Sequence, residues 1–359
     1  MAVPLFDTRT PLAPLREQIA ARVGAVMESG RFILGPEVAA FEEEWAAYLG
    51  VPHAIGVANG TDAITLALLA LGVGPGDEVV VPSFTFYASA EAIPPTGATP
   101  VFCDVDPETF CATPDTVRAA LTPRTKAVIV VHLFGNVAPV EAIEALGVPV
   151  VEDAAQAAGA RAADGRRAGA LGTVATFSFF PSKNLGAFGD AGAVTTADDG
   201  VAERVRMLRF HGSRDKSTFE LVGQNSRLDA VQAAVLRVLL PHLDGWCEGR
   251  RAAAAHYEAA GLGAHAALPA PIGGCEPAWH LYVVRHPRGD ELLERLVAAG
   301  VEARAYYRVP THLQPAMRRW DEGAPLPGTE QAAREHVALP MSPVLDAAQA
   351  REVTTAAAP

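Results

Sequence analysis

The chain has 359 residues, of which half are hydrophobic and 19% are charged, and its formal net charge at pH 7 is −12. This composition is typical of a globular protein, and the negative charge argues against a nucleic-acid partner, because phosphate backbones bind basic surfaces. No apolar run reaches the roughly 20 residues of a membrane span, and the first residues lack a signal-peptide pattern, so we expect a cytoplasmic protein with no membrane partner.

The predicted elements begin with two helices. Residues 13–29 and residues 35–50 have helical apolar spacing, and Gly30 and Gly50 end them. From residue 53 onward, short β-rich runs alternate with helical runs, which predicts a parallel or mostly parallel sheet covered by helices. The expected strands are residues 53–58, 77–83, 99–105, 125–133, 148–153, 173–180 and 192–197, and the helices between them are residues 62–71, 114–121 and 140–146.

The C-terminal third has a different pattern. A long helical stretch near residues 227–260, interrupted at Pro241, is typical of a helix that bridges a large domain and a small one. Single cores stop growing at roughly 250–300 residues, so we expect a large α/β domain over residues 1–244 and a smaller α+β domain over residues 245–359. The elements expected in the smaller domain are strands at residues 279–286 and 301–307 and a helix at residues 289–300.

Cysteine and lysine usage narrows the chemistry. The cysteines show no CxxC pairing, so we expect reduced thiols and no metal site. Only three of the 29 Lys and Arg residues are lysines, namely Lys126, Lys183 and Lys216. Lysine can lose its proton and act as a nucleophile, whereas arginine cannot. Lys126 fits an ordinary turn before a strand, which leaves two lysines as candidates for a chemical role.

The first polar segment of interest follows the strand expected at residues 53–58. In open α/β sheets, ligands lie at the carboxyl ends of strands, and here Asn59-Gly60-Thr61-Asp62 precedes a helix. Backbone N–H groups at a helix N-terminus can bind an anion such as a phosphate. Ordinary N-capping by Thr61 or Asp62 would explain the same residues. The segment is not a dinucleotide fingerprint, and the chain has no Walker loop.

Two further segments end strands of the predicted sheet. Asp153 is followed by Ala154-Ala155-Gln156, and a carboxylate at this place can pair with the ring nitrogen of pyridoxal phosphate or cap a helix. Lys183 lies in a glycine-rich loop after the strand that contains Ser178, whose hydroxyl could reach a phosphate. A desolvated lysine loses its proton readily and can form an imine. The Gly60-Thr61 turn and Asp153 both precede Lys183 in the chain, and each follows a predicted strand. We therefore favour this role for Lys183 over that of a surface lysine.

Together these segments resemble a known family. The segments FSFFPSKNLGAFGDAGA, VEDAAQAAGA, NGTDAITLAL, SFTFYASA and GQNSRLDAVQAAVL resemble the DegT/DnrJ/EryC-type nucleotide-sugar aminotransferases. These enzymes of deoxysugar and antibiotic-sugar biosynthesis use pyridoxal 5′-phosphate and have the aspartate aminotransferase fold, fold type I. The likeness runs from about residue 10 to the C-terminus. It implies a large cofactor-binding domain with a mostly parallel sheet and a smaller α+β domain.

The resemblance assigns roles around the cofactor ring. Lys183 matches the catalytic lysine that carries the cofactor as a Schiff base. Asp153 matches the partner of the ring nitrogen, and Gln156 matches the group near the ring hydroxyl. Phe86 matches the aromatic side chain that stacks on the ring.

At the phosphate end, Gly60, Thr61 and Ser178 match the ligands of the cofactor phosphate. Asn225 matches an asparagine that reaches this phosphate from the neighbouring subunit. The resemblance therefore implies a homodimer with shared active sites.

The resemblance also implies a ping-pong reaction. An amino acid, L-glutamate by resemblance, gives its amino group to the cofactor, and a keto sugar then takes it, with Lys183 as the base and acid of the proton shift. The residues after Lys183 are similar to those of relatives that act on nucleotide-linked 3-keto sugars. Relatives that act on 4-keto sugars more often have a Gly-Glu-Gly there. We therefore expect a dTDP-linked 3-amino-3-deoxy sugar as product, with a 4-keto substrate as the alternative.

Two segments are candidates for the sugar nucleotide. The loop Phe210-His211-Gly212-Ser213-Arg214-Asp215-Lys216 carries two cations, and it is either part of the diphosphate site or a solvated loop. The stretch that begins at Tyr306 matches a family segment that usually reads His-Tyr-Pro-x-Pro, so Tyr306 replaces the His and Arg308 the first Pro. The resulting candidates for substrate contacts are His211, Lys216, Tyr307 and His312.

Three other functions are less favoured. The dehydratase branch of the family replaces the Schiff-base lysine by histidine, but Lys183 is present. A regulator that uses the fold without turnover would need a DNA-binding segment and a basic surface. An aminotransferase for a cyclitol ketone would need no nucleotide, so protection by dTDP against thermal unfolding would distinguish it.

Overall fold

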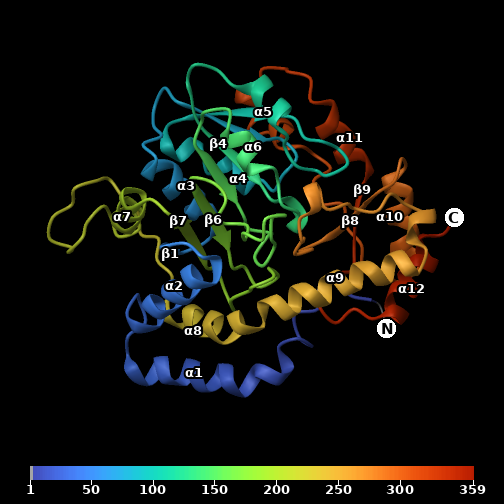
Figure 1. Ribbon diagram of the computed structural model, residues 1–359, viewed down its shortest axis with the longest axis horizontal. Helices are drawn as coiled ribbons and strands as arrows, with labels where there is room; N and C mark the ends of the chain where they lie inside the picture. The colour runs from blue at the N-terminus through green and yellow to red at the C-terminus, as the bar shows by residue number, and fades with distance from the viewer. Residues whose placement is uncertain (1–2) are drawn as a thin grey trace.

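The computed structural model describes residues 3–359 and has a seven-stranded sheet between helices, with a smaller two-stranded sheet towards the C-terminus (Figure 1). Every strand expected between residues 53 and 197 is present. The α/β class predicted from the sequence is therefore confirmed. The strands of the large sheet are β1 (His53–Val57), β2 (Glu78–Pro82), β3 (Thr99–Cys103), β4 (Thr125–Val131), β5 (Val150–Asp153), β6 (Val174–Ser178) and β7 (Gly192–Thr196).

The order of the strands brings the predicted segments together. The sheet has the order β1-β7-β6-β5-β4-β2-β3, and β7 is antiparallel to both of its neighbours. Two antiparallel pairings in succession make β1 point the same way as β6, and β5 and β4 are parallel to β6. The carboxyl ends of β1, β6, β5 and β4 therefore lie at one edge, although the segments that follow them are far apart in the sequence.

Helices cover both faces of this sheet. Pro36 opens α2 and Gly50 ends it in the left-handed conformation at φ 76°, as expected from the sequence. Trp45 of α2 packs edge-on against Phe177 and Phe179, with ring centroids 5.0 and 5.5 Å apart. The helices are α1 (Arg16–Ser29), α2 (Pro36–Leu49), α3 (Gly60–Ala70), α4 (Ala88–Glu91), α5 (Pro114–Ala120), α6 (Val140–Glu144), α7 (Asp199–Leu208) and α8 (Ala230–Leu239).

The long helical stretch is interrupted at Pro241, as predicted. After α8, a short 3-10 turn (Leu240–His242) leads into α9 (Leu243–Ala259), which runs from beneath the large sheet to the C-terminal part (Figure 1). There β8 (Tyr282–Arg285) pairs antiparallel with β9 (His336–Leu339), and the helices are α10 (Gly289–Ala298), α11 (Pro327–Glu335) and α12 (Ala347–Ala357). We propose that the two domains, 1–244 and 245–359, divide near the start of α9.

The prediction of a strand over residues 301–307 is wrong. Only Arg304 pairs with a strand, at Ala338 of β9. The neighbouring backbone groups have other partners, because Glu302 N–H donates to Val3 O and Tyr307 N–H donates to His336 Nε2. Pairing therefore stops after one residue, and the chain turns into the cavity described below. Within residues 3–359, no helix is both long and apolar enough to cross a membrane.

Candidate active site

A cavity of about 820 Å³ opens at the carboxyl edge of the large sheet. It is lined by the turn after β1, the ends of β4, β5 and β6, and side chains of the C-terminal part. Every residue predicted to bind the cofactor lines this cavity except Asn225. The topology thus gathers segments that are more than 100 residues apart in the sequence.

Lys183 lies in the tight loop between β6 and β7 and lines the cavity. Lys183 N–H donates to Phe180 O at 2.8 Å, and Ala187 N–H donates to Phe179 O at 2.7 Å. A Cβ at Gly186 would lie 2.5 Å from Pro181 O, so the loop needs glycine at this position. Burial lowers the pKa of the Lys183 amine to about 8, although the Asp153 charge opposes this shift. The amine is therefore far more often neutral than that of an exposed lysine.

Asp153 ends β5 and is buried with both carboxylate oxygens engaged. Its Oδ2 accepts a 2.7 Å hydrogen bond from Ser89 Oγ, and its Oδ1 accepts a 3.2 Å bond from Ala155 N–H. Thr85 Oγ1 lies 3.0 Å from Ser89 Oγ. Ser89 was not predicted as a site residue, although it belongs to the quoted segment SFTFYASA, because nothing in that segment shows which hydroxyl faces the carboxylate.

The β1–α3 turn provides an anion site of the predicted kind. Asn59 caps α3 by accepting a 2.8 Å hydrogen bond from Asp62 N–H, so neither Thr61 nor Asp62 is the capping residue. Thr61 instead lines the cavity. A Cβ at Gly60 would lie 2.7 Å from Ser178 Cβ, which means that the helix start packs directly on the end of β6. The first N–H groups of α3 and the Ser178 hydroxyl therefore meet at one point.

Gln156 is held by two contacts at the wall of the cavity. Its Oε1 accepts a 2.7 Å hydrogen bond from Phe134 N–H, and its Nε2 donates to Tyr307 Oη at 3.2 Å. Tyr307 also stacks on Phe134, with ring centroids 5.9 Å apart, and its burial raises the pKa of its hydroxyl. Phe86 lies in the cavity lining with 56% of its surface exposed, so its ring is available to a ligand.

Four of the predicted residues lie outside this cavity. His312 is buried elsewhere, and its Nδ1 makes a hydrogen bond with Ser83 Oγ. Asn225 is exposed and forms a backbone bridge with Phe210. His211 and Lys216 belong to the adjoining loop, which projects from the body of the protein beyond α7 (Figure 1).

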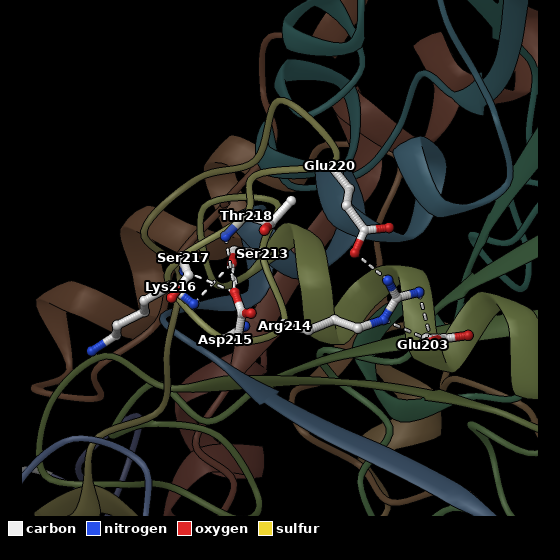
Figure 2. Close-up of polar contacts among 8 residues, drawn as sticks. All are labelled: Glu203, Ser213, Arg214, Asp215, Lys216, Ser217, Thr218 and Glu220. Atoms are coloured by element: carbon white, nitrogen blue, oxygen red, sulfur yellow. Dashed lines mark hydrogen bonds and ion pairs between the residues drawn. The ribbon is translucent and has the colours of Figure 1, made fainter.

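The projecting loop is ordered by its own polar contacts (Figure 2). Asp215 Oδ1 accepts hydrogen bonds from the backbone N–H groups of Ser217 and Thr218, at 2.8 and 3.0 Å. Arg214 forms ion pairs with Glu203 and Glu220. The Lys216 side chain points away from these residues, and its Nζ lies 4.9 Å from the centroid of the Phe210 ring. Of the two cations predicted to bind a diphosphate, Arg214 is thus already paired, and Lys216 has no ion pair within residues 3–359.

Comparisons with known proteins agree with this geometry. The sequence model of the DegT/DnrJ/EryC1/StrS aminotransferase family matches residues 14–357 of this chain. The dTDP-3-amino-3,4,6-trideoxy-alpha-D-glucose transaminase of Streptomyces venezuelae is 48% identical, over 99% of this chain and 95% of its own. A "Pleiotropic regulatory protein" of Geobacillus stearothermophilus is 47% identical, over 98% and 97%. The crystal structure of S. venezuelae DesV in complex with a ketimine intermediate superimposes with a TM-score of 0.94 at 47% identity, covering 99% of this chain and 97% of that one.

Proposed function

The chain belongs to the DegT/DnrJ/EryC1/StrS aminotransferase family and is a sugar aminotransferase of fold type I, and we propose that it converts a dTDP-linked 3-keto-deoxysugar into its 3-amino sugar with L-glutamate as amino donor. The main observation behind this proposal is that Lys183, Asp153 and the β1–α3 turn line the same cavity. The name of the S. venezuelae relative supports a dTDP-linked substrate and an amino group at carbon 3 of the sugar.

The family implies pyridoxal phosphate, and the residues of the cavity fit that group. Lys183 would hold it covalently, and Asp153 would pair with the ring nitrogen. When bound, the cofactor supplies an electron sink that acidifies the carbon bearing the amino group. The buried amine with its lowered pKa, the carboxylate and the helix start match the aldehyde, the ring nitrogen and the phosphate of this cofactor. The phosphate ligands would be Gly60, Thr61 and Ser178, with Phe86 on the ring face and Gln156 near the ring hydroxyl.

Lys183 would also perform the proton transfer. Burial lowers the pKa of its amine to about 8, so the amine is neutral often enough to accept a proton from the substrate carbon. The same group can then return the proton to the neighbouring position. Ser89 keeps the Asp153 carboxylate oriented throughout, and the phenyl rings of Phe86 and Phe180 line the cavity.

We also propose that two copies of the chain share their active sites. Asn225 and Lys216 lie outside the cavity of their own chain, in or beside a loop that projects from the protein. Several large apolar side chains, among them Phe86 and Phe180 of the cavity lining, are about half exposed, which favours burial against a second copy. In this dimer, Asn225 of the partner subunit would reach the cofactor phosphate, and the partner's Lys216 would bind the diphosphate of the sugar nucleotide. The exposed apolar residues are Phe32, Ile33, Phe86, Phe180 and Phe188.

The remaining sugar contacts stay predictions. His211 would accompany Lys216 in the projecting loop, and Tyr307 is present in the cavity with its hydroxyl near Gln156. His312 would have to act from behind the cavity wall, where Ser83 holds it.

The position of the amino group can be tested directly. The purified holoenzyme is incubated with a dTDP-3-amino-deoxysugar or with its 4-amino isomer, and conversion of the cofactor from its aldehyde to its amine absorption is followed. The proposal predicts conversion by 3-amino sugars. Conversion by 4-amino sugars alone would assign the enzyme to the 4-keto alternative, and conversion by neither would refute a dTDP-sugar substrate.

A regulatory role is a second candidate, because a 47% identical relative carries a regulatory name. The gathering of Lys183, Asp153 and the β1–α3 turn around one cavity is the arrangement that catalysis requires, and the transaminase name of the 48% identical relative favours it. Turnover by the wild-type protein would decide for catalysis.

A further inference from the structure

A second cation shares the cavity with Lys183. Among the described residues that line the cavity, Lys183 and Arg304 are the only Lys or Arg side chains. We propose that Arg304 binds a carboxylate of the amino donor and so selects the amino acid that enters the reaction. This inference rests on the proposed function, because it requires that an amino acid react in this cavity.

The backbone of Arg304 is fixed while its side chain is free. Arg304 N–H donates to Ala338 O at 3.1 Å, and Ala338 N–H donates to Arg304 O at 2.8 Å, so the residue is attached to β9 on both sides. Its side chain is exposed and has no acidic partner within 4 Å in the part of the chain that the structure describes. A guanidinium on a rigid backbone and without a partner is well placed to bind an incoming anion.

A nearby arginine shows the contrast. Arg308, four residues further on, pairs with Asp290 at 2.7 Å and donates hydrogen bonds to the carbonyl oxygens of Ala333 and Arg334. It therefore ties the segment to the end of α11 and the start of α10. Arg308 has a structural role, whereas the role of Arg304 is not explained by packing.

No carboxylate that lines the cavity forms an ion pair with Arg304 in the described part of the chain. Asp153 is already engaged by Ser89, and neither Asp62 nor Asp190 pairs with Arg304 within residues 3–359. Tyr306, two residues further along the chain, lines the same cavity. The Arg304 guanidinium thus lines the cavity without an ion-pair partner among the described residues.

The anion that matches this charge is a carboxylate of the amino donor. In an amino acid, the α-carboxylate is bonded directly to the reacting carbon, so it must enter the cavity that contains Lys183. The diphosphate of a nucleotide 3-keto sugar is separated from its reacting carbon by the ring and the glycosidic oxygen, and therefore lies further out. Lys183 is occupied with proton transfer, which leaves Arg304 as the cation for the carboxylate among the described Lys and Arg side chains of the same chain that line the cavity. The planar guanidinium fork fits a carboxylate with two hydrogen bonds.

The test separates the two halves of the reaction. Holoenzymes with Arg304→Gln and Arg304→Lys are compared with wild type and with Arg351→Gln, which removes an exposed arginine of α12 outside the cavity. For Arg304→Gln we expect kcat/KM of the half-reaction with L-glutamate to fall about ten- to a hundredfold, as for loss of a charge-assisted hydrogen bond. The half-reaction with the dTDP-3-amino sugar should change by less than about threefold. Arg304→Lys should recover part of the loss, and Arg351→Gln should match wild type.

The amino acids used identify the carboxylate. An equal loss with L-glutamate, L-alanine and L-glutamine would assign Arg304 to the α-carboxylate, and a loss with L-glutamate alone would assign it to the side-chain carboxylate. Either result supports the proposal. No loss with any amino acid, an equal loss in both half-reactions, or a loss confined to the sugar would overturn it.

A binding measurement keeps this inference separate from the proposed function. Glutarate carries two carboxylates and no amino group, so its stabilisation of the holoenzyme against thermal unfolding reports the carboxylate site alone. Wild type should be stabilised and Arg304→Gln should not. If wild type reacted with no amino acid, the proposed function would fail, but stabilisation by glutarate that depends on Arg304 would still support the site. Equal stabilisation of both proteins would refute the site even if the enzyme were active.

Discussion

Ser89 Oγ donates a 2.7 Å hydrogen bond to Oδ2 of Asp153, the carboxylate at the end of β5. Ser89 has one hydroxyl proton and gives it to the carboxylate, so Thr85, 3.0 Å away, must donate to Ser89. We predict that Ser89→Ala slows the half-reaction with L-glutamate about tenfold, the usual effect of one lost hydrogen bond to a charged group. Thr85→Val should slow it less, because it removes only the outer bond. Single-turnover rates measure both, and a wild-type rate for Ser89→Ala would contradict this role.

The contact between Gly60 and Ser178 predicts that a single methyl group impairs cofactor binding. In Gly60→Ala the new Cβ would lie 2.7 Å from Ser178 Cβ, so the start of α3 must move away from β6. We expect pyridoxal phosphate to bind about tenfold more weakly, as when a phosphate contact loses one charge-assisted hydrogen bond. Gly74→Ala is the control, because a Cβ there meets no atom within 4 Å. Titration of both apoproteins with the cofactor checks this, and equal affinities would be inconsistent with the tight packing.

The lowered pKa of Lys183 predicts how cofactor capture depends on pH. Only the neutral amine attacks the aldehyde, and burial lowers the pKa of this amine from 10.5 to about 8. Below pH 8 the amine is mostly protonated and above it mostly neutral. The rate at which the apoprotein captures pyridoxal phosphate should therefore rise with pH and level off above about 8. A rate that continued to rise towards pH 10.5 would show that Lys183 titrates like an exposed lysine.

Shared active sites can be tested with two inactive variants. Lys183→Ala lacks the catalytic amine, and Asn225→Ala lacks the side chain that we propose reaches the partner subunit. In a mixed dimer, one of the two sites would receive both native residues, so co-expression of the two variants should restore part of the activity. Dimers of either variant alone should be far less active than this mixture. If the mixture were no more active than the variants, Asn225 would act within its own chain or not at all.

Much of the large domain could be predicted from the sequence. Buried strands such as β4 and β5 read as short apolar runs, and glycines such as Gly50 mark the ends of helices, because these are local properties. The order of the segments around Gly60, Asp153 and Lys183 predicted the cavity, since parallel strands bring their carboxyl ends together. The antiparallel placement of β7 was not predicted, because strand direction depends on the connections.

The contacts between distant segments could not be predicted. Tyr307 reaches Gln156 across 151 positions of the sequence, and the direction of the Ser89 hydroxyl depends on how α4 packs beside β5. Residues 301–307 have the composition of a strand, but only Arg304 finds a strand partner, so local pattern alone gave a wrong element there. Strand β9, four residues directly after α11, was missed because it is too short to show a period of its own.

The central claim is that Lys183 carries the cofactor and releases it to an amino donor. Borohydride reduction of the wild-type holoenzyme, followed by peptide mapping with mass spectrometry, identifies the lysine to which pyridoxal phosphate is attached. We predict that the label lies on Lys183 and that prior incubation with L-glutamate prevents it, because the amino group then resides on the freed cofactor. A label on Lys126 or Lys216 would contradict the account. So would a label on Lys183 that still forms after prior incubation with every amino donor tested.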